Sequence, residues 1–350
     1  MTPVSNMPRR VLGRTGLNVS VLGFGSAPLG DLYAKLDDST AISAVDRAFE
    51  LGINLLDTSP LYGHGLSEHR CGTAIRRVPR QDIVVCTKVG RWMDPFPGPA
   101  SIQGPASAPG FAGGLPHRAV VDYSYDGTMR SVEQSLLRLG TDRLDLLLIH
   151  DVDVWTHGDA IEDRFREAMA GAYVALDKLR SEGVVAGIGI GVNEADMCVR
   201  FAKAGSFDTM LLAGRYSLLE QPALAQFLPL AQQQGMAVML GGVFNSGILA
   251  TGAIPGAKYN YQDAPPDVMT KVANIERVCK AHGVALSTAA LHFALGHPAV
   301  ATVVLGAQKP EEVERNVAAL SGQVPSALWS DLKAQHLLDP DAPVPSSAPR

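Results

Sequence analysis

The stretch IVVCTK (83–88) is a short run of apolar, largely β-branched residues that ends in a lysine. Two other runs have the same form: INLLD (53–57) ends in an aspartate and LDLLLIH (144–150) ends in a histidine. Runs of this length and composition predict buried β-strands. Polar residues at the carboxyl ends of buried parallel strands are where such folds place their chemistry. The three runs therefore bear on the fold and on the function together.

Five more runs of this kind follow or precede them: VSVLGFG (19–25), VAGIGIGV (185–192), DTMLLA (208–213), MAVMLGG (236–242) and VATVVLG (300–306). Amphipathic segments separate the runs, at 38–51, 67–77, 126–139, 164–182, 194–204, 222–234, 266–296 and 310–320. Strands that alternate with helices predict parallel strands joined by crossover helices. Eight alternations favour an α/β fold with a (β/α)8 TIM barrel over an open, doubly wound sheet.

Segments outside the alternation of strands and helices predict a hairpin, a long loop and the bounds of the domain. The stretch RRVLGRTGLNVS (9–20) has the pattern of an N-terminal β-hairpin, which would cover the bottom of the barrel. Residues 90–118, rich in Gly, Pro, Ala and Ser, predict a long active-site loop after the third strand. We expect a single barrel domain over residues 10–330 and a flexible C-terminal tail over 331–350.

The amino-acid composition limits the kinds of molecule that we expect the protein to bind. The 350 residues are 46% hydrophobic, enough to bury a large core, and carry a net charge of -5 without basic runs. That balance gives no electrostatic footprint for nucleic acid or an anionic membrane, so we expect small-molecule partners. No signal segment and no span of about 18 apolar residues is present, which favours a cytoplasmic location. The scattered cysteines, without CxxC spacing, predict buried free thiols and no metal site: Cys71, Cys86, Cys198 and Cys279.

The glycine-rich run GIGIG (187–191) superficially resembles a dinucleotide-binding loop. Its third glycine comes one position early, and no acidic residue ends a following strand at the required distance. We interpret these glycines as allowing close backbone packing in a barrel strand.

Four polar residues at the predicted strand ends form a plausible acid/base device. The phenol of Tyr62, with an ordinary pKa near ~10, needs a cation and a hydrogen-bonding partner to exchange protons near neutral pH. We expect Lys88, compensated by Asp57, to lower the pKa of Tyr62, and His150 to hydrogen-bond the reacting oxygen. Taken singly, Asp57 could instead cap a helix, Tyr62 could be a loop aromatic and His150 a core histidine.

Several stretches resemble the aldo-keto reductase superfamily: GRTGLNVSVLGFGSAPLG, NLLDTSPLYGHGLSE, VVCTKVGR and DLLLIHD. The resemblance covers residues 10–320. It implies that Tyr62 donates or accepts the proton, that Lys88 and Asp57 adjust the acidity of Tyr62, and that His150 orients the substrate oxygen. It also implies a nicotinamide dinucleotide bound across the barrel mouth without a Rossmann domain.

The resemblance extends to the cofactor site. Backbone amides in GGVFNSGIL (241–249) could face the pyrophosphate. Glu312 stands where NADPH-preferring relatives carry an arginine, and a carboxylate there would repel a 2′-phosphate. NAD is therefore favoured, while nearby Lys309 leaves NADP open.

Gly241 lacks the tyrosine ring that stacks on the nicotinamide in many relatives. The residues implied for cofactor binding are Gly25, Ser26, Asp57, Asn193, Gly242, Phe244, Ser246, Gly306, Gln308, Glu312 and Asn316.

Within the superfamily, DYSYDGTMRSVEQSLLRLG (122–140), HDVDVWTHG (150–158) and GRYSLLEQ (214–221) are similar to the aldose 1-dehydrogenases that oxidise L-fucose and D-arabinose. This implies that Tyr62 acts as a base on the anomeric hydroxyl and that a lactone forms. Trp92, Tyr123 and Trp155 are expected to wall a sugar pocket. Pyridoxal oxidation, general aldehyde or ketone reduction, and a non-catalytic dinucleotide sensor stay open, as does the oligomeric state.

Overall fold

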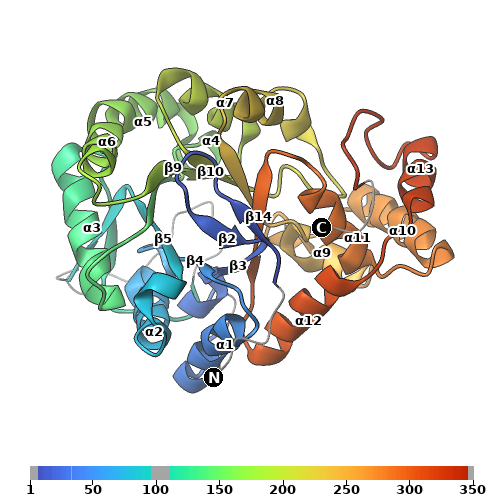
Figure 1. Ribbon diagram of the computed structural model, residues 1–350, viewed down its shortest axis with the longest axis horizontal. Helices are drawn as coiled ribbons and strands as arrows, with labels where there is room; N and C mark the ends of the chain where they lie inside the picture. Colours follow the sequence, from blue (N-terminus) through green and yellow to red (C-terminus); the bar gives the residue numbers. More distant parts are fainter. Residues whose placement is uncertain (1–6, 33, 96–110, 346–350) are drawn as a thin grey trace.

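The computed structural model describes residues 7–32, 34–95 and 111–345. Eight parallel strands close into a barrel, and helices ring its outside (Figure 1). Each barrel strand pairs with the barrel strands that precede and follow it in chain order, and the last barrel strand pairs with the first. The predicted (β/α)8 TIM barrel is thus confirmed. The strands are β3 (Leu22–Gly25), β4 (Leu55–Asp57), β5 (Val84–Val89), β8 (Leu146–His150), β9 (Gly187–Val192), β10 (Thr209–Ala213), β11 (Ala237–Gly241) and β14 (Val300–Gly306).

The helices cover the barrel with their apolar faces. In the first of them, small residues such as Ala41 and Ala44 are fully buried, and Asp37 caps the amino end by accepting from the amide of Thr40 at 3.1 Å. The helices are α1 (Asp38–Glu50), α2 (Leu66–Ile75), α3 (Tyr125–Leu139), α4 (Val154–His157), α5 (Ile161–Glu167), α6 (Tyr173–Ser181), α7 (Ala195–Ala204), α8 (Phe227–Gln233), α9 (Ile248–Thr251), α10 (Pro266–Ala281), α11 (Leu286–Leu295), α12 (Pro310–Ser321) and α13 (Ser326–Ala334). A π-helical turn, Ala168–Ala172, joins α5 to α6.

Alternation along the strands decides which side chains enter the barrel. On β5, Val84 and Cys86 belong to a compact apolar cluster inside the barrel, whereas Val85 packs outward against the helices. Successive side chains of a strand point to opposite faces, so Lys88 continues the inward row. By the same period, His150 follows the inward residues of β8, and Asp57 follows the inward residue of β4. Three of the predicted site residues therefore enter the barrel at its carboxyl end.

A hairpin closes the other end. Strands β1 (Arg9–Val11) and β2 (Asn18–Ser20) pair antiparallel, and Leu12 and Val19 join the apolar cluster inside the barrel. The predicted N-terminal hairpin is therefore present. The first barrel strand begins at Leu22 and not at residue 19, because Val19 and Ser20 pair with β1 instead.

Two further hairpins lie among the loops after barrel strands. Strands β6 (Arg91–Asp94) and β7 (Arg118–Val121) flank the long segment after β5. Residues 96–110 of that predicted loop lie outside the described residues. Strands β12 (Lys258–Tyr259) and β13 (Gln262–Asp263) form a small hairpin after β11.

The C-terminal part of the described chain packs against the barrel helices. Helix α13 crosses the boundary expected at residue 330, and beyond it Leu338 and Ala342 are almost fully buried. Lys333 donates to the carbonyls of Pro340 and Ala342, both at 2.8 Å. The structure thus gives residues 331–345 a defined place next to α10, while 346–350 lie outside the described residues.

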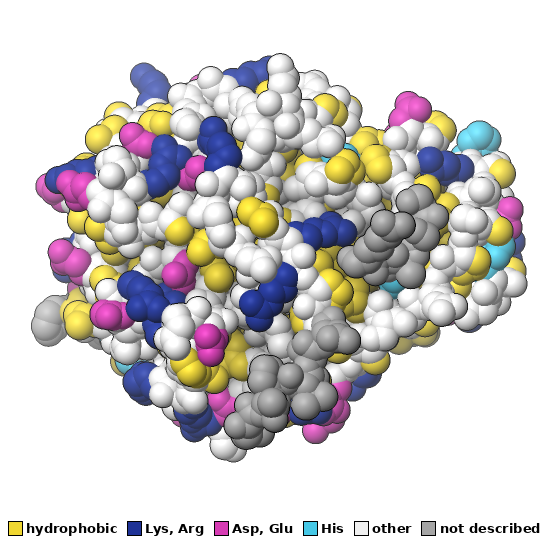
Figure 2. Space-filling model, viewed as in Figure 1, with side chains coloured by type: hydrophobic (Ala, Val, Ile, Leu, Met, Phe, Trp, Pro, Cys, Tyr) yellow, Lys and Arg dark blue, Asp and Glu magenta, His cyan; other side chains and the backbone are white. Residues whose placement is uncertain are grey.

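Charged side chains of both signs share the surface, and the cysteines lie in the core. Lys and Arg side chains on the face shown in Figure 2 are interspersed with Asp and Glu. All four cysteines are buried and free. In the described ranges, no single helix is long and apolar enough to cross a membrane; α10 and α11 reach that length and composition only as a pair bent by 96°.

Candidate active site

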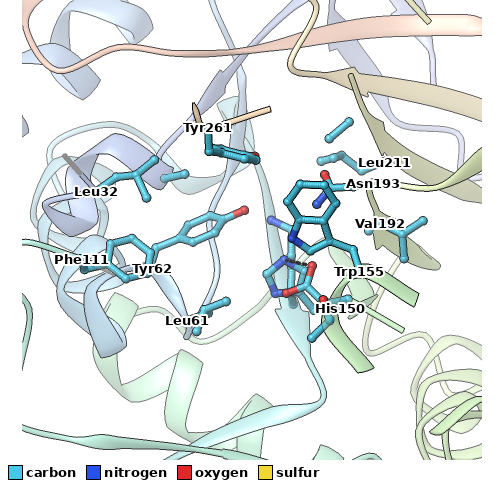
Figure 3. Close-up of a pocket in the computed structure, with 16 residues that line it drawn as sticks. Leu32, Leu61, Tyr62, Phe111, His150, Trp155, Val192, Asn193, Leu211 and Tyr261 are labelled. Atoms are coloured by element: carbon cyan, nitrogen blue, oxygen red, sulfur yellow. Dashed lines mark ion pairs between the residues drawn. The ribbon is translucent and has the colours of Figure 1, made fainter. Parts of the chain in front are cut away.

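A cavity opens at the carboxyl end of the barrel, where the inward rows of β4, β5 and β8 end (Figure 3). Its polar lining comes from several loops and strand ends, and its remaining lining is apolar, with Leu32, Leu61 and Phe111 near Tyr62. The polar and charged residues that line it are Tyr62, Lys88, His150, Asp151, Trp155, Thr156, Asn193 and Tyr261.

Lys88 and Asp57 form a buried ion pair at the base of this cavity. The Nζ of Lys88 donates to both carboxylate oxygens of Asp57, at 2.9 and 2.8 Å, and to the carbonyl of Thr58 at 2.8 Å. Lys88 is only 1% exposed. Burial acts to lower the pKa of Lys88, but the charge of Asp57 and its hydrogen bonds to the ammonium oppose this, so the pKa is raised and the ammonium persists. All three N–H donors of Lys88 are thereby used.

Tyr62 stands over this ammonium. The Nζ of Lys88 lies 4.8 Å from the centre of the Tyr62 ring, and the rings of Tyr62 and His150 meet edge to face at 5.9 Å. The turn that carries Tyr62 is held against Gly30, where an added Cβ would lie 2.5 Å from the Tyr62 carbonyl carbon. Only a glycine fits this approach.

The pKa of Tyr62 departs from the expectation. Burial raises the pKa of the phenol above its usual value, and the charge of Lys88 opposes this without overcoming it. Lys88 lowers the pKa as expected, but desolvation disfavours the phenolate more than this one cation favours it, so the net shift is upward. The site therefore holds a neutral phenol beside an ammonium.

His150 is a neutral imidazole fixed from both sides. Its Nδ1 lies 3.1 Å from the Oγ of Ser59, and its Nε2 lies 3.3 Å from Oδ1 of Asp151. Burial, and then the charges of Lys88 and Arg91, hold the pKa of His150 well below its usual value. A neutral imidazole carries one N–H donor and one acceptor, so it can hydrogen-bond an alcohol or a carbonyl oxygen.

Two charged residues of the site were not predicted. Asp151 follows His150 directly, lines the cavity, and pairs with Arg91, whose Nη1 lies 2.9 Å from Oδ2. Burial raises the pKa of Asp151 to about 6, although Arg91 opposes the shift. The order His-Asp at a strand end was visible in the sequence, but its pairing with Arg91, distant along the chain, was not.

A second cavity adjoins the first and carries part of the predicted cofactor site. Asn193, Ala213, Trp155 and Tyr261 line both cavities. Gly242, at φ +61°, and Ser246 line the second, and a Cβ on Gly242 would lie 3.1 Å from the amide nitrogen of Gly214. The close backbone approach leaves no room for a side chain at Gly242 in the loop where the sequence predicts the pyrophosphate. Phe244 lies between these two residues on the same loop and is half-buried.

The remaining cofactor residues lie at the β3 and β14 ends and on α12. Gly25 pairs with Gly306 and with Asp57, so these three strand ends are neighbours. Ser26 is fully buried, and its Oγ accepts from the Oγ of Ser67 at 2.8 Å. Ser26 thus serves the packing of the loop.

On α12 the structure assigns Glu312 a local partner. The amide of Gln308 donates to Oε2 of Glu312 at 2.8 Å. Asn316, one turn further along the helix, is half-buried. The carboxylate of Glu312 is therefore held at the start of the helix by the backbone of the preceding loop.

The three aromatic residues expected around the substrate lie in different places. Trp155 lines both cavities. Trp92 is turned to Asp122, to which its Nε1 donates at 3.2 Å, and Arg130 covers its ring at 3.6 Å. Tyr123 is fully buried and its hydroxyl donates to the carbonyl of His150 at 2.7 Å. The structure brings Trp155 to the site, whereas Tyr123 supports His150 from behind.

Comparison with known proteins gives consistent matches. The model of the Aldo/keto reductase family matches residues 21–335. A pyridoxal 4-dehydrogenase of Microbacterium luteolum is 40% identical, over 94% of this chain and 98% of that protein. A D-threo-aldose 1-dehydrogenase of a Pseudomonas species is 35% identical, over 92% and 96%. The holo form of an aldo-keto reductase from Bacillus halodurans superposes with a TM-score of 0.72 at 28% identity, covering 97% and 99% of the two chains.

Proposed function

Because the chain belongs to the aldo/keto reductase family and is an NAD(P)-dependent oxidoreductase, we propose that it oxidises the anomeric hydroxyl of an aldose to a lactone. L-Fucose and D-arabinose represent the proposed substrate class. Tyr62 is the acid/base in this proposal, and a cytoplasmic location is part of it. One relative named an aldose 1-dehydrogenase supports the reaction type.

One observation carries the proposal: a phenol, a buried ammonium and a neutral imidazole meet in a single cavity at the barrel mouth. In oxidation, Tyr62 takes the proton of the anomeric hydroxyl. Lys88, kept charged by Asp57, favours the phenolate that this step requires. His150 hydrogen-bonds the same oxygen and holds it between the two rings. The nicotinamide, when bound, accepts the hydride from the sugar carbon.

The residues of the second cavity would hold the dinucleotide. Gly242 and Ser246 would approach the pyrophosphate, and Asn193, which lines both cavities, would reach the carboxamide end. Glu312 supports a preference for NAD, because the resemblance puts its carboxylate near the adenine ribose, where it would repel a 2′-phosphate. Since oxidation needs the phenolate and burial raises the pKa of Tyr62, turnover in this direction is expected to rise with pH through the alkaline range.

Pyridoxal oxidation is the second candidate, because the relative named pyridoxal 4-dehydrogenase shares 40% of its residues with this chain. Pyridoxal forms an internal hemiacetal, so the same base can serve it. The apolar side of the cavity, with Leu32 and Phe111, suits a flat heteroaromatic ring as well as a sugar face. The two candidates therefore differ in substrate and not in mechanism.

Initial rates of nicotinamide reduction for a panel of aldoses and pyridoxal, each with NAD and NADP, test this proposal. We expect the highest kcat/KM with an aldose and NAD. A kcat/KM at least tenfold higher for pyridoxal would transfer the proposal to the second candidate. Binding of dinucleotide without turnover of any substrate would contradict both and indicate a sensor.

A further inference from the structure

Asp151 is a charged residue in the cavity for which the acid/base mechanism has no use. We propose that Asp151 determines specificity by accepting a hydrogen bond from a substrate hydroxyl next to the carbon that is oxidised. The site would then prefer polyhydroxylated substrates over aldehydes and alcohols that carry no neighbouring hydroxyl. This inference rests on the proposed function and deepens it.

The position of Asp151 places it within reach of the substrate. Asp151 lines the same cavity as Tyr62, Lys88 and His150, and its side chain is 15% exposed. Its Oδ1 lies 3.3 Å from Nε2 of His150, the edge of the imidazole opposite Ser59 (Figure 3). His150 and Asp151 could therefore contact two adjacent oxygens of one bound molecule.

The hydrogen-bonding capacity of the two carboxylate oxygens is unequal. Oδ2 forms an ion pair with Nη1 of Arg91, 2.9 Å away. Oδ1 has its contact to His150 at 3.3 Å, longer than an ordinary N–H···O bond. Each carboxylate oxygen accepts up to two hydrogen bonds, so Oδ1 has capacity for a further donor. Hydroxyl groups are donors, whereas a simple aldehyde offers none.

The buried ion pair next to Asp151 has its own partners. The donors of Lys88 are all taken by Asp57 and the carbonyl of Thr58. Asp57 in turn accepts from Lys88 through both oxygens. Among the described residues that line the cavity, Asp151 is thus the one carboxylate.

The backbone at Asp151 is also unusual. Its φ is +54°, in the left-handed region that disfavours residues with a Cβ, and its amide is fixed by the carbonyl of Gly191 at 2.9 Å. Such conformations cost roughly 1–3 kcal/mol each and cluster at functional sites. The strained turn aims the side chain of the residue after His150 into the cavity.

A purely structural role, the neutralisation of buried Arg91, is the competing explanation. Asp145 provides a matched control for it. Asp145 precedes the same strand, β8, at the opposite end of the barrel, pairs with Arg80 at 2.7 Å and is 16% exposed. Both aspartates therefore compensate one arginine at similar burial, but only Asp151 lines the cavity.

The test compares Asp151→Asn with Asp145→Asn on two substrates that are both oxidised with NAD: L-fucose, and benzyl alcohol, which carries no neighbouring hydroxyl. Asn keeps the shape and tolerates the backbone conformation but removes the charge. We expect kcat/KM of Asp151→Asn to fall about 10-fold to 100-fold for the sugar, as for loss of a hydrogen bond to a charged group, and to stay within about twofold for benzyl alcohol. Asp145→Asn should leave the ratio of the two kcat/KM values unchanged.

A measurement on the wild-type protein alone serves if Asp151→Asn fails to fold. Burial raises the pKa of Asp151 to about 6, so the ratio of kcat/KM for L-fucose to that for benzyl alcohol, both oxidised with NAD so that the pH dependence of Tyr62 cancels, should fall as the pH drops from 7 to 5. The groups that face Asp151 are Arg91, Asp153, Lys88, His150, Tyr62, Tyr123 and His157. Of these, the imidazole of His150 stays neutral in this window because burial lowers its pKa well below the usual value.

A selectivity ratio that is flat from pH 5 to 7, or that is equal in wild type and Asp151→Asn, would overturn the inference. So would an equal loss on both substrates, which would indicate that Asp151 only positions His150 or Arg91. If the wild-type protein turned over neither substrate, the proposed function itself would fail, and that outcome is distinct from turnover without selectivity.

Discussion

At the residue scale, burial sets the protonation states of the site. The pKa of Tyr62 is raised by desolvation, and the pKa of His150 is lowered by it. Asp151 follows the same rule, since burial raises its pKa to about 6. In each case burial shifts the equilibrium towards the neutral form, although Asp151, with a pKa of about 6, is still ionised at pH 7. Lys88 is the exception because Asp57 neutralises its charge in direct contact.

The shift at Asp151 predicts how stability changes with pH. Its pKa is about 6 in the folded chain against an ordinary 3.8, so between these values the folded protein binds more protons than the unfolded chain. The contribution of Asp151 is fully present below pH 3.8 and is lost as the pH rises through 6. Relative to Asp151→Asn, the wild-type free energy of unfolding should therefore fall by up to about 3 kcal/mol between pH 4 and 7.

Denaturant titrations of both proteins at several pH values measure this difference. A difference that instead grew with pH would mean that Arg91 stabilises the carboxylate more than burial disfavours it.

The residues of the proton device were predictable because of where they stand. Asp57, Lys88 and His150 each end an apolar run, and parallel strands bring their carboxyl ends together. The sign of the Tyr62 shift was not predictable, since the depth of burial depends on loops far away in the chain. The places of Trp92 and Tyr123 depend likewise on partners, Asp122 and the His150 carbonyl, that no spacing reveals.

At the element scale, the contact between α2 and α3 depends on one glycine. A Cβ on Gly72 would lie 2.4 Å from the carbonyl oxygen of Leu139. Replacing an interior helix glycine by alanine ordinarily stabilises a helix by up to ~1 kcal/mol. Here we expect the opposite: Gly72→Ala should lower the free energy of unfolding by about 1–3 kcal/mol, because the helices must separate.

Thr73→Ala, next on the same helix, is the control and should change that free energy by no more than about 0.5 kcal/mol. Equal effects of the two substitutions in urea titrations, or a stabilising Gly72→Ala, would refute the close packing of α2 on α3.

Elements that depend on local pattern were predicted, and those that depend on pairing partners were not. The eight barrel strands and the N-terminal hairpin follow from apolar runs and turn glycines. The start of the first barrel strand was misplaced because residue 19 fits either the hairpin or the barrel, and pairing with β1 decides it. Strands β6 and β7 were missed because they border a segment rich in glycine and proline.

At the scale of the whole molecule, alternation of strand and helix along the chain was sufficient for the barrel, because closure requires only eight such units. The path of residues 331–345 could not be predicted from this alternation. Their place depends on partners at α10, where Arg277 donates to Gln335 at 2.9 Å and His282 lies 2.7 Å from Asp331, and not on a period of their own.

Cofactor binding should stabilise the whole barrel, since its site joins the ends of several strands. At 100 times its Kd, a ligand adds about 2.7 kcal/mol to the free energy of unfolding. We expect NAD to raise Tm more than NADP does at equal concentration, because in the proposed binding mode the carboxylate of Glu312 would repel the 2′-phosphate. Glu312→Gln should narrow this gap, and Glu311→Gln, on the exposed side of α12, should not. A larger Tm shift with NADP would contradict the assignment.

The most direct test of the account compares Tyr62→Phe with the wild-type protein in two measurements: hydride transfer from L-fucose to NAD, and the Kd for NAD. The substitution removes one hydroxyl group and keeps the ring that packs on Lys88 and His150. The account predicts that turnover falls by about 10²- to 10⁴-fold while the Kd for NAD changes by less than about twofold. Equal turnover in Tyr62→Phe would contradict the claim that this phenol moves the proton.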